Sequence, residues 1–228
     1  MTYLNNGDNN ITKQNGEKKM QPKPKNHWIF DFDGVIGDTF SICIKTDMLM
    51  TGDTFEVARQ RQTEMFMVNF LTHKHERHNL DTDQFIVEFC KLAKEDAKGF
   101  DTFIKCLKTI FDEGDSRYAI VSSGSKDYIL PILNRAGIAS CFDYILCRQD
   151  GKSKVDKVNR VINGWGAKPN EVKFFADTIN DVIELSPIIG LENIFGCAWG
   201  FHGRELLAKV VLNANILLEQ EDVLKINL

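Results

Sequence analysis

The chain has 228 residues, 43% of them hydrophobic, so it can bury a core in one large domain or in a domain with an inserted lobe. Its net charge of −4 gives no general attraction to nucleic acid or to an anionic membrane surface, and we expect neither as a partner. No apolar stretch approaches the ~20 residues of a membrane-spanning helix, and we expect no secretory signal because the N-terminus lacks an apolar core.

The N-terminal residues 1–25 are rich in Asn, Lys, Gln and Gly. This composition predicts a disordered tail, because too little apolar surface is available for burial. The six cysteines are scattered, mostly inside apolar runs, and form no CxxC pair. Such usage is typical of reduced core cysteines, so we expect a cytoplasmic protein.

The first predicted element is a strand over residues 28–32, which opens with Trp28-Ile29-Phe30 and reads as buried on both faces. Asp31 and Asp33 fall at its C-terminal end, where open parallel sheets bind their ligands. Buried carboxylates are costly unless they pair, form hydrogen bonds or hold a metal. Two carboxylates this close also raise one another's pKa, which suits a nucleophile beside an acid. A strand that ends in a polar turn is the structural alternative.

A helical pattern follows, from residue 39 to about residue 115. Apolar residues recur at spacings of three and four in four successive stretches, and the clearest stretch contains Phe103 and Leu107. Gly114 is expected to end that helix in a left-handed conformation. Because no strand signal interrupts the four helices, the pattern predicts a helical bundle over 39–115, inserted after the first strand.

From residue 116 onward, predicted strands and helices alternate. Strands are expected at 118–121, 142–147, 172–176 and 194–199, with helices at 128–136, 155–162 and 179–185 between them. Gly137 and Gly164 are expected to close the first two helices, and Pro187 to stop the third. Alternation of this kind forces parallel pairing, so residues 26–38 and 116–228 are predicted to form one doubly wound, Rossmann-like α/β core.

Polar side chains follow each of the central strands. They are Asp31 and Asp33, Ser122 and Ser123, and Asp177 and Asp181, with Lys152 and Lys154 before the helix that follows the third strand. Parallel strands end at one edge of a sheet, so we expect these groups to gather there. Asp31, Asp33 and Asp177 offer hard oxygen ligands that suit Mg²⁺, and the lack of His or Cys among them argues against zinc.

Residues 31–39, Asp-Phe-Asp-Gly-Val-Ile-Gly-Asp-Thr, resemble the first motif of the haloacid dehalogenase-like superfamily, DxDGVxxDT. Ser122 is similar to the second-motif Ser or Thr, Lys154 to the third-motif lysine, and Asp177 and Asp181 to the paired acids of the fourth motif. The resemblance covers about residues 28–200. It implies that the helical insert is a cap of the kind found in phosphoglycolate phosphatase and β-phosphoglucomutase.

The resemblance also implies a role for each of these residues. Asp31 would attack phosphorus in line and form an aspartyl-phosphate, and Asp33 would protonate the leaving oxygen and later activate water. Mg²⁺ would be held by Asp31, Asp177 and the main-chain carbonyl of Asp33, and Asp181 would complete the acidic set by orienting water or Lys154. Ser122 and Lys154 would bind the transferring phosphoryl oxygens.

For the phosphate-binding serine and for the lysine, a nearby residue of the same type is an alternative. Ser123 is the alternative phosphate-binding serine, and Ser122 is preferred because of its position at the strand end. Lys152 is the alternative lysine, and Lys154 is preferred because its separation from Asp177 fits the family better. The Lys-Pro pair common in capped relatives is missing here, and an alanine stands where a glycine usually precedes the fourth-motif acid.

Asp33 narrows the expected reaction, because dehalogenase and phosphonatase relatives have no acid at this position. We therefore expect a Mg²⁺-dependent phosphatase that acts on a small phosphorylated metabolite under a mobile cap. A sugar phosphomutase of the β-phosphoglucomutase type is the alternative. A non-catalytic phosphate-binding protein is less favoured, because a binder has no use for Asp33.

Two groups of basic residues in the predicted lobe are weaker candidates for functional sites. His73, His75 and His78 read as a solvated or substrate-facing surface rather than a metal site, because only His75 and His78 share a helical face. Arg59 and Arg61 read as a solvated helix face rather than contacts to an anionic substrate.

Overall fold

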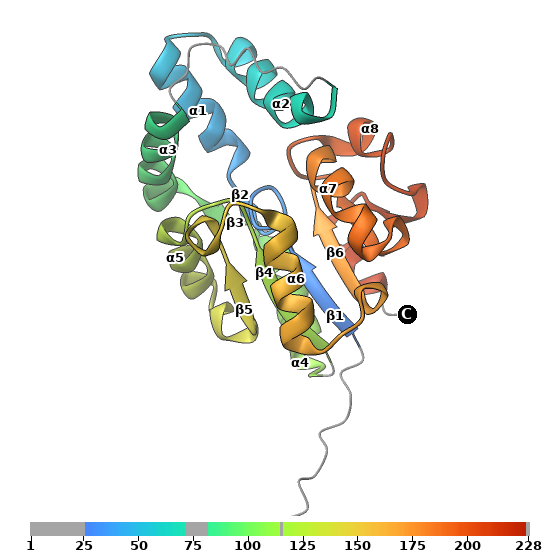
Figure 1. Ribbon diagram of the computed structural model, residues 1–228. Helices are drawn as coiled ribbons and strands as arrows, with labels where there is room; N and C mark the ends of the chain where they lie inside the picture. The colour runs from blue at the N-terminus through green and yellow to red at the C-terminus, as the bar shows by residue number, and fades with distance from the viewer. Residues whose placement is uncertain (1–25, 72–81, 115, 227–228) are drawn as a thin grey trace, which may run out of the picture.

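The computed structural model describes residues 26–71, 82–114 and 116–226, so the predicted tail and the three lobe histidines lie outside the described residues. Six parallel strands form one sheet. Their order is β5 (Tyr144–Leu146), β4 (Ser116–Val121), β1 (Asn26–Phe30), β6 (Val172–Ala176), β7 (Ile194–Cys197) and β8 (Ile216–Leu217). Helices connect the strands (Figure 1), which confirms the predicted α/β fold.

Helices cover both faces of the sheet. One face carries α4 (Asp101–Asp112) and α5 (Lys126–Ala136), the other α6 (Lys154–Trp165) and α7 (Ile179–Ile189), and α8 (Gly203–Leu207) follows β7. Along β1, Trp28 and Phe30 pack on the α4 and α5 side, whereas Ile29 packs on the α6 and α7 side. This alternation explains why the strand sequence is apolar without a break.

Two helix ends differ from the prediction. The helix α7 runs through Pro187 to Ile189, because Leu185 and Ile189 stay buried against the sheet and the proline removes only its own hydrogen-bond donor. The helix α6 passes Gly164 and ends at Gly166, which has a positive φ of 64°. Tertiary packing therefore outweighed the local stop signals, whereas Gly137 ends α5 as expected, with φ 71°.

Among the described residues, three helices form a lobe beyond the carboxyl ends of the strands: α1 (Phe40–Thr51), α2 (Phe55–Leu71) and α3 (Thr82–Asp96) (Figure 1). A two-stranded antiparallel ribbon, β2 (Gly37–Asp38) and β3 (Lys98–Gly99), joins the lobe to the core. None of the described helices, in the lobe or in the core, has the length and apolar character that a membrane crossing requires.

The fourth helix of the expected bundle, α4, packs against the sheet rather than in the lobe. The ring of Phe103 lies 6.1 Å from that of Phe30 in β1, and its main-chain N–H donates to the side chain of Gln220 at 2.9 Å. Helical periodicity shows that a stripe is apolar but not which surface the stripe will cover. We therefore propose that the lobe spans residues 39–97 and that α4 belongs to the core, in place of a boundary at residue 115.

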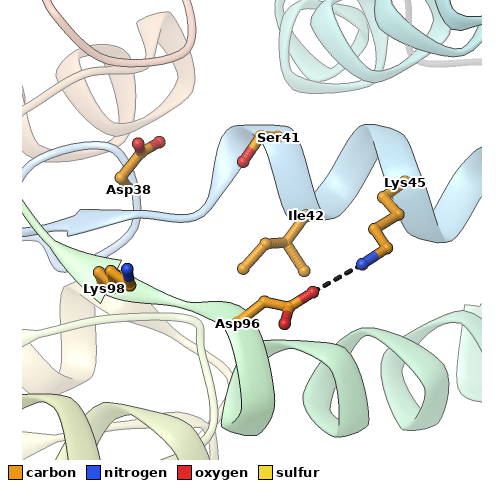
Figure 2. A pocket seen from close by; sticks show the side chains of 6 residues that line it. All are labelled: Asp38, Ser41, Ile42, Lys45, Asp96 and Lys98. Carbon is orange, nitrogen blue, oxygen red and sulfur yellow. Dashed lines mark hydrogen bonds and ion pairs between the residues drawn. The ribbon is translucent and has the colours of Figure 1, made fainter.

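A pocket lies beside the ribbon, where the lobe meets the core (Figure 2). Lys45 of α1 reaches Asp96 of α3 there, with 2.6 Å between Nζ and Oδ2. Both side chains are about half exposed, so the ion pair contributes little to stability. The pocket is not lined by any of the predicted site acids, which are Asp31, Asp33, Asp177 and Asp181.

Candidate active site

The ends of three adjacent strands deliver the predicted site residues. Asp31 follows β1, Ser122 follows β4 and Asp177 follows β6, and these strands are neighbours in the order β4-β1-β6. Lys154 opens α6 and Asp181 lies in the first turn of α7. All five residues are buried, so residues far apart in the chain share one interior region at the rim of the sheet.

Lys154 joins two of the acids. Its Nζ lies 2.8 Å from Oδ2 of Asp31 and 2.6 Å from Oδ1 of Asp181. Burial opposes the charged form of the lysine, but Asp181 and Asp31 outweigh it and raise its pKa. Burial likewise opposes ionisation of Asp181, yet Lys154 together with hydrogen bonds to Asp31 and Thr178 outweighs it and lowers that pKa.

Asp31, Asp177 and Asp181 form a cluster in which one oxygen of each lies within 4.8 Å of the others. Burial raises the pKa of Asp177 to about 8 and that of Asp31 well above its usual value. Oδ2 of Asp177 accepts from the main-chain N–H of Phe201 at 2.8 Å, whereas its buried Oδ1 has no hydrogen-bond partner among the described residues. A buried carboxylate oxygen of this kind, in an all-oxygen donor set, fits a hard divalent cation.

The backbone approaches Asp177 closely at Gly34. This glycine has φ 73°, and a Cβ atom built on it would lie 1.9 Å from Oδ2 of Asp177. No other residue type would fit there without moving the acid. Glycine is therefore required at position 34, because the carboxylate of Asp177 occupies the space that a side chain would need.

The side chain of Asp33 is not among the acids of this cluster, and a metal contact through its main-chain carbonyl stays a prediction. The side chain accepts hydrogen bonds from Thr39 at 2.8 Å, from Tyr128 at 2.8 Å and 3.0 Å, and from Ser122 at 3.3 Å. Burial raises the pKa of Asp33, and the hydroxyl donors oppose that rise. Its carboxylate therefore lies apart from the cluster and is held by hydroxyl groups.

Sequence reasoning assigned no role to Tyr128 or Thr39. Thr39 ends the DxDGVxxDT motif, so its place in that motif was an available signal. Tyr128 lies in the first turns of α5, on the stripe of the helix that packs inward, and periodicity alone marks it as a core residue. Nothing local in the sequence indicates that its hydroxyl meets Asp33.

Burial distinguishes Ser122 from Ser123 and Lys154 from Lys152, the two pairs of alternatives in the sequence. Ser122 is buried, accepts from the N–H of Gly124 at 2.8 Å and contacts Asp33, whereas Ser123 is exposed. Lys154 lies among the acids, whereas Lys152 is exposed in the loop before α6. The structure thus brings Ser122 and Lys154 into the site and leaves their neighbours outside it.

Arg61 is not on a solvated face, as the pattern of α2 suggested. Its guanidinium contacts the carboxylates of Asp47 and Asp53, and Gln62 donates to Asp47 at 2.6 Å. These contacts hold α1 and α2 together inside the lobe. The guanidinium of Arg61 therefore forms ion pairs inside the lobe.

The chain thus forms a doubly wound α/β domain with buried acids and a lysine at the ends of its central strands. The family model described as "Haloacid dehalogenase-like hydrolase" matches residues 28–184, which is more than half of the chain. The chain belongs to this family of hydrolases. Among curated protein sequences, none matches this one significantly.

Solved structures share the fold. A haloacid dehalogenase-like hydrolase from Streptococcus pneumoniae aligns with TM-score 0.68 and 16% identity, covering 89% of this chain and 98% of that one. A protein from Clostridium acetobutylicum, named as a predicted phosphatase, gives 0.66 and 20%, covering 90% and 100%. A Thermotoga maritima protein provisionally named β-phosphoglucomutase gives 0.62 and 19%, covering 89% and 98%. Each alignment is long enough to include residues of both the core and the lobe.

Proposed function

We propose that this hydrolase is a Mg²⁺-dependent phosphatase that cleaves a small phosphomonoester through an aspartyl-phosphate on Asp31. The observation that carries the proposal is the buried cluster of Asp31, Asp177 and Asp181, joined to Lys154 by contacts of 2.6 and 2.8 Å. The fold relative from Clostridium acetobutylicum that is named as a predicted phosphatase supports the same reaction.

The acids of the cluster divide into a nucleophile and metal-holding groups. Asp31, Asp177 and the main-chain carbonyl of Asp33 would hold Mg²⁺, with Asp181 beside them, and the bound ion supplies positive charge between two anions. Asp31 attacks phosphorus while Lys154 and Ser122 bind the phosphoryl oxygens, over which charge is spread in the transition state. Lys154, which contacts Asp31 at 2.8 Å, also opposes the rise that burial causes in the pKa of the nucleophile.

Asp33 supplies the proton transfers in this scheme. It gives a proton to the bridging oxygen as the P–O bond to the alcohol breaks, and the alcohol leaves. The resulting carboxylate then takes a proton from the water that attacks the aspartyl-phosphate, which releases phosphate and restores both acids. The lobe acts as the cap that excludes bulk water during transfer, and the composition supports a cytoplasmic location.

A sugar phosphomutase is the second candidate, favoured by the fold relative named β-phosphoglucomutase. A mutase returns the phosphoryl group to a second hydroxyl instead of to water. Dependence of turnover on a catalytic sugar bisphosphate, without release of free phosphate, would decide for this candidate.

The test is a phosphate-release assay over a panel of phosphorylated metabolites, with and without Mg²⁺. We expect Mg²⁺-dependent release from at least one small phosphomonoester. The variant Asp31→Asn should lose activity while leaving the fold intact, because the amide preserves volume but not nucleophilicity. Asp112→Asn, at the exposed end of α4, is the matched control and should be fully active. Unchanged turnover in Asp31→Asn would exclude the covalent mechanism.

A further inference from the structure

Among the described residues, Tyr128 and Thr39 donate the shortest side-chain hydrogen bonds to Asp33, each at 2.8 Å. The Tyr128 hydroxyl lies 2.8 Å from Oδ2 and 3.0 Å from Oδ1, so one donor is shared by both carboxylate oxygens. Tyr128 is 1% exposed and has no part in the acidic cluster or in phosphate binding. No step of the proposed reaction uses this contact between Tyr128 and Asp33.

The local sequence is arranged to admit this hydroxyl. A Cβ atom on Gly124 would lie 2.0 Å from the Tyr128 oxygen and 2.6 Å from Oδ2 of Asp33. Ser125 caps α5 by accepting from the N–H of Asp127, which places Tyr128 in the first turns of the helix. Glycine at 124 therefore leaves the space in which Tyr128 and Asp33 meet.

The ring of Tyr128 is packed between the core and the lobe. Phe32, which separates the two acids of the first motif, lies edge-on at 6.1 Å between ring centroids. Phe89 of α3 lies edge-on at 5.4 Å from the lobe side. A movement of α3 away from α5 would remove the Phe89 contact and free the Tyr128 ring on that side.

We infer that Tyr128 is a positioning residue for Asp33, and that the seating of the lobe, through Phe89, sets the position of its hydroxyl. A phenol hydroxyl can donate to a carboxylate and accept from a carboxylic acid, so it can hold Asp33 before and after each proton transfer. When the lobe is seated, Asp33 is held for the transfer of its proton to the leaving oxygen. This inference rests on the proposed phosphatase function.

The test is Tyr128→Phe, assayed on two substrates whose leaving groups differ in their need for a proton. An alkyl phosphate releases a strongly basic alkoxide unless an acid protonates it, whereas p-nitrophenyl phosphate releases a stable phenolate. We expect kcat/KM to fall about tenfold or more on the alkyl phosphate, because a misplaced general acid loses part of its contribution. On p-nitrophenyl phosphate, kcat/KM should change far less. An equal loss on both substrates would overturn the inference.

Tyr118→Phe is the matched control. Tyr118 is also buried, and its hydroxyl donates to the main-chain carbonyl of Ile110 at 3.1 Å, away from the acids. Both variants remove one buried hydroxyl from a tyrosine in the core, so a general loss of stability should appear in both melting temperatures. The selective loss on the alkyl phosphate should appear only in Tyr128→Phe.

Phe89→Leu tests the link to the lobe. It keeps the Tyr128 hydroxyl but removes the aromatic contact, and we expect the same substrate-selective loss in a weaker form. Phe85→Leu, which removes the ring that stacks on Phe89 at 6.3 Å, is the control and should not discriminate between the substrates. Equal effects of Phe89→Leu on the two substrates would overturn the lobe link.

The outcome for wild-type protein separates this inference from the proposed function. If the wild type releases phosphate from neither substrate with Mg²⁺ present, the proposed function fails. If the wild type is active and Tyr128→Phe shows no leaving-group dependence, the function stands and the inference alone fails.

Discussion

Lys154 balances the charge of the buried acids. It is 5% exposed, and its ammonium group contacts Asp31 and Asp181, while Asp177 lies in the same cluster. A buried carboxylate without a partner is strongly disfavoured, so the cluster depends on its ion pairs with Lys154 when no metal is bound. The lysine thus has a structural role in addition to the proposed binding of phosphate.

Replacement of Lys154 by Met should therefore affect both stability and activity. We expect the free energy of unfolding to fall by about 3–5 kcal/mol, because two buried carboxylates lose their partner. Urea denaturation measures this loss, and phosphate release should disappear. Lys152→Met, in the exposed loop before α6, should leave both quantities unchanged. Similar effects of the two variants would contradict the assignment of Lys154.

At the next level of organisation, α6 fixes the ends of two strands. Ser153 caps the helix by accepting from the N–H of Asp156 at 3.0 Å, which places Lys154 at the first helical position. One turn later, the buried Nζ of Lys157 donates to the carbonyl of Ser122 at 2.5 Å and to that of Cys147 at 3.4 Å. The helix therefore joins the carboxyl ends of β4 and β5 and holds the serine of the site in place.

The variant Lys157→Met should loosen this attachment. The carbonyl oxygens of Ser122 and Cys147 lose their lysine donor, so we expect a loss of about 1–3 kcal/mol in the free energy of unfolding. Because the Ser122 hydroxyl moves with its backbone, KM for the phosphorylated substrate should rise. Chemical denaturation and steady-state kinetics measure the two effects. Asn159→Ala, on the exposed side of the same helix, should change neither.

For the molecule as a whole, the acidic cluster makes stability depend on pH. The pKa of Asp177 is about 8 in the folded chain, against about 3.9 for an ordinary aspartate. Between these two values the folded protein without metal holds a proton that the unfolded chain has lost. Stability therefore falls as pH rises through this window, by up to about 1.4 kcal/mol per pH unit for each such proton.

We predict that metal-free protein becomes less stable from about pH 4 to about pH 8, and that Mg²⁺ stabilises it increasingly over that range as it replaces the proton. Thermal unfolding at several pH values, with Mg²⁺ or with EDTA, measures both trends. Asp177→Asn should flatten the metal-free slope and raise the Mg²⁺ concentration needed for activity by about tenfold or more. A slope unchanged in this variant would show that another group carries the pH dependence.

Local patterns in the chain were sufficient to predict the strands whose ends carry the site residues. The apolar run before Asp31, the polar turn at Ser122 and the acids after residue 176 are each readable within a few residues, because strand burial and turn chemistry are short-range properties. Since parallel strands end at a common edge, their meeting place followed from the fold class. The doubly wound sheet was confirmed on this basis.

Long-range packing decided the features that no window of sequence contains. The apolar stripe of α4 covers the sheet instead of the lobe, and the carboxylate of Asp33 turns to Thr39 and Tyr128 rather than to the other acids. Phe89 reaches Tyr128 from a different part of the fold. A helix pattern specifies that a face will be buried, but the partner of that face, and the direction in which a buried side chain points, depend on residues brought together only when the chain folds.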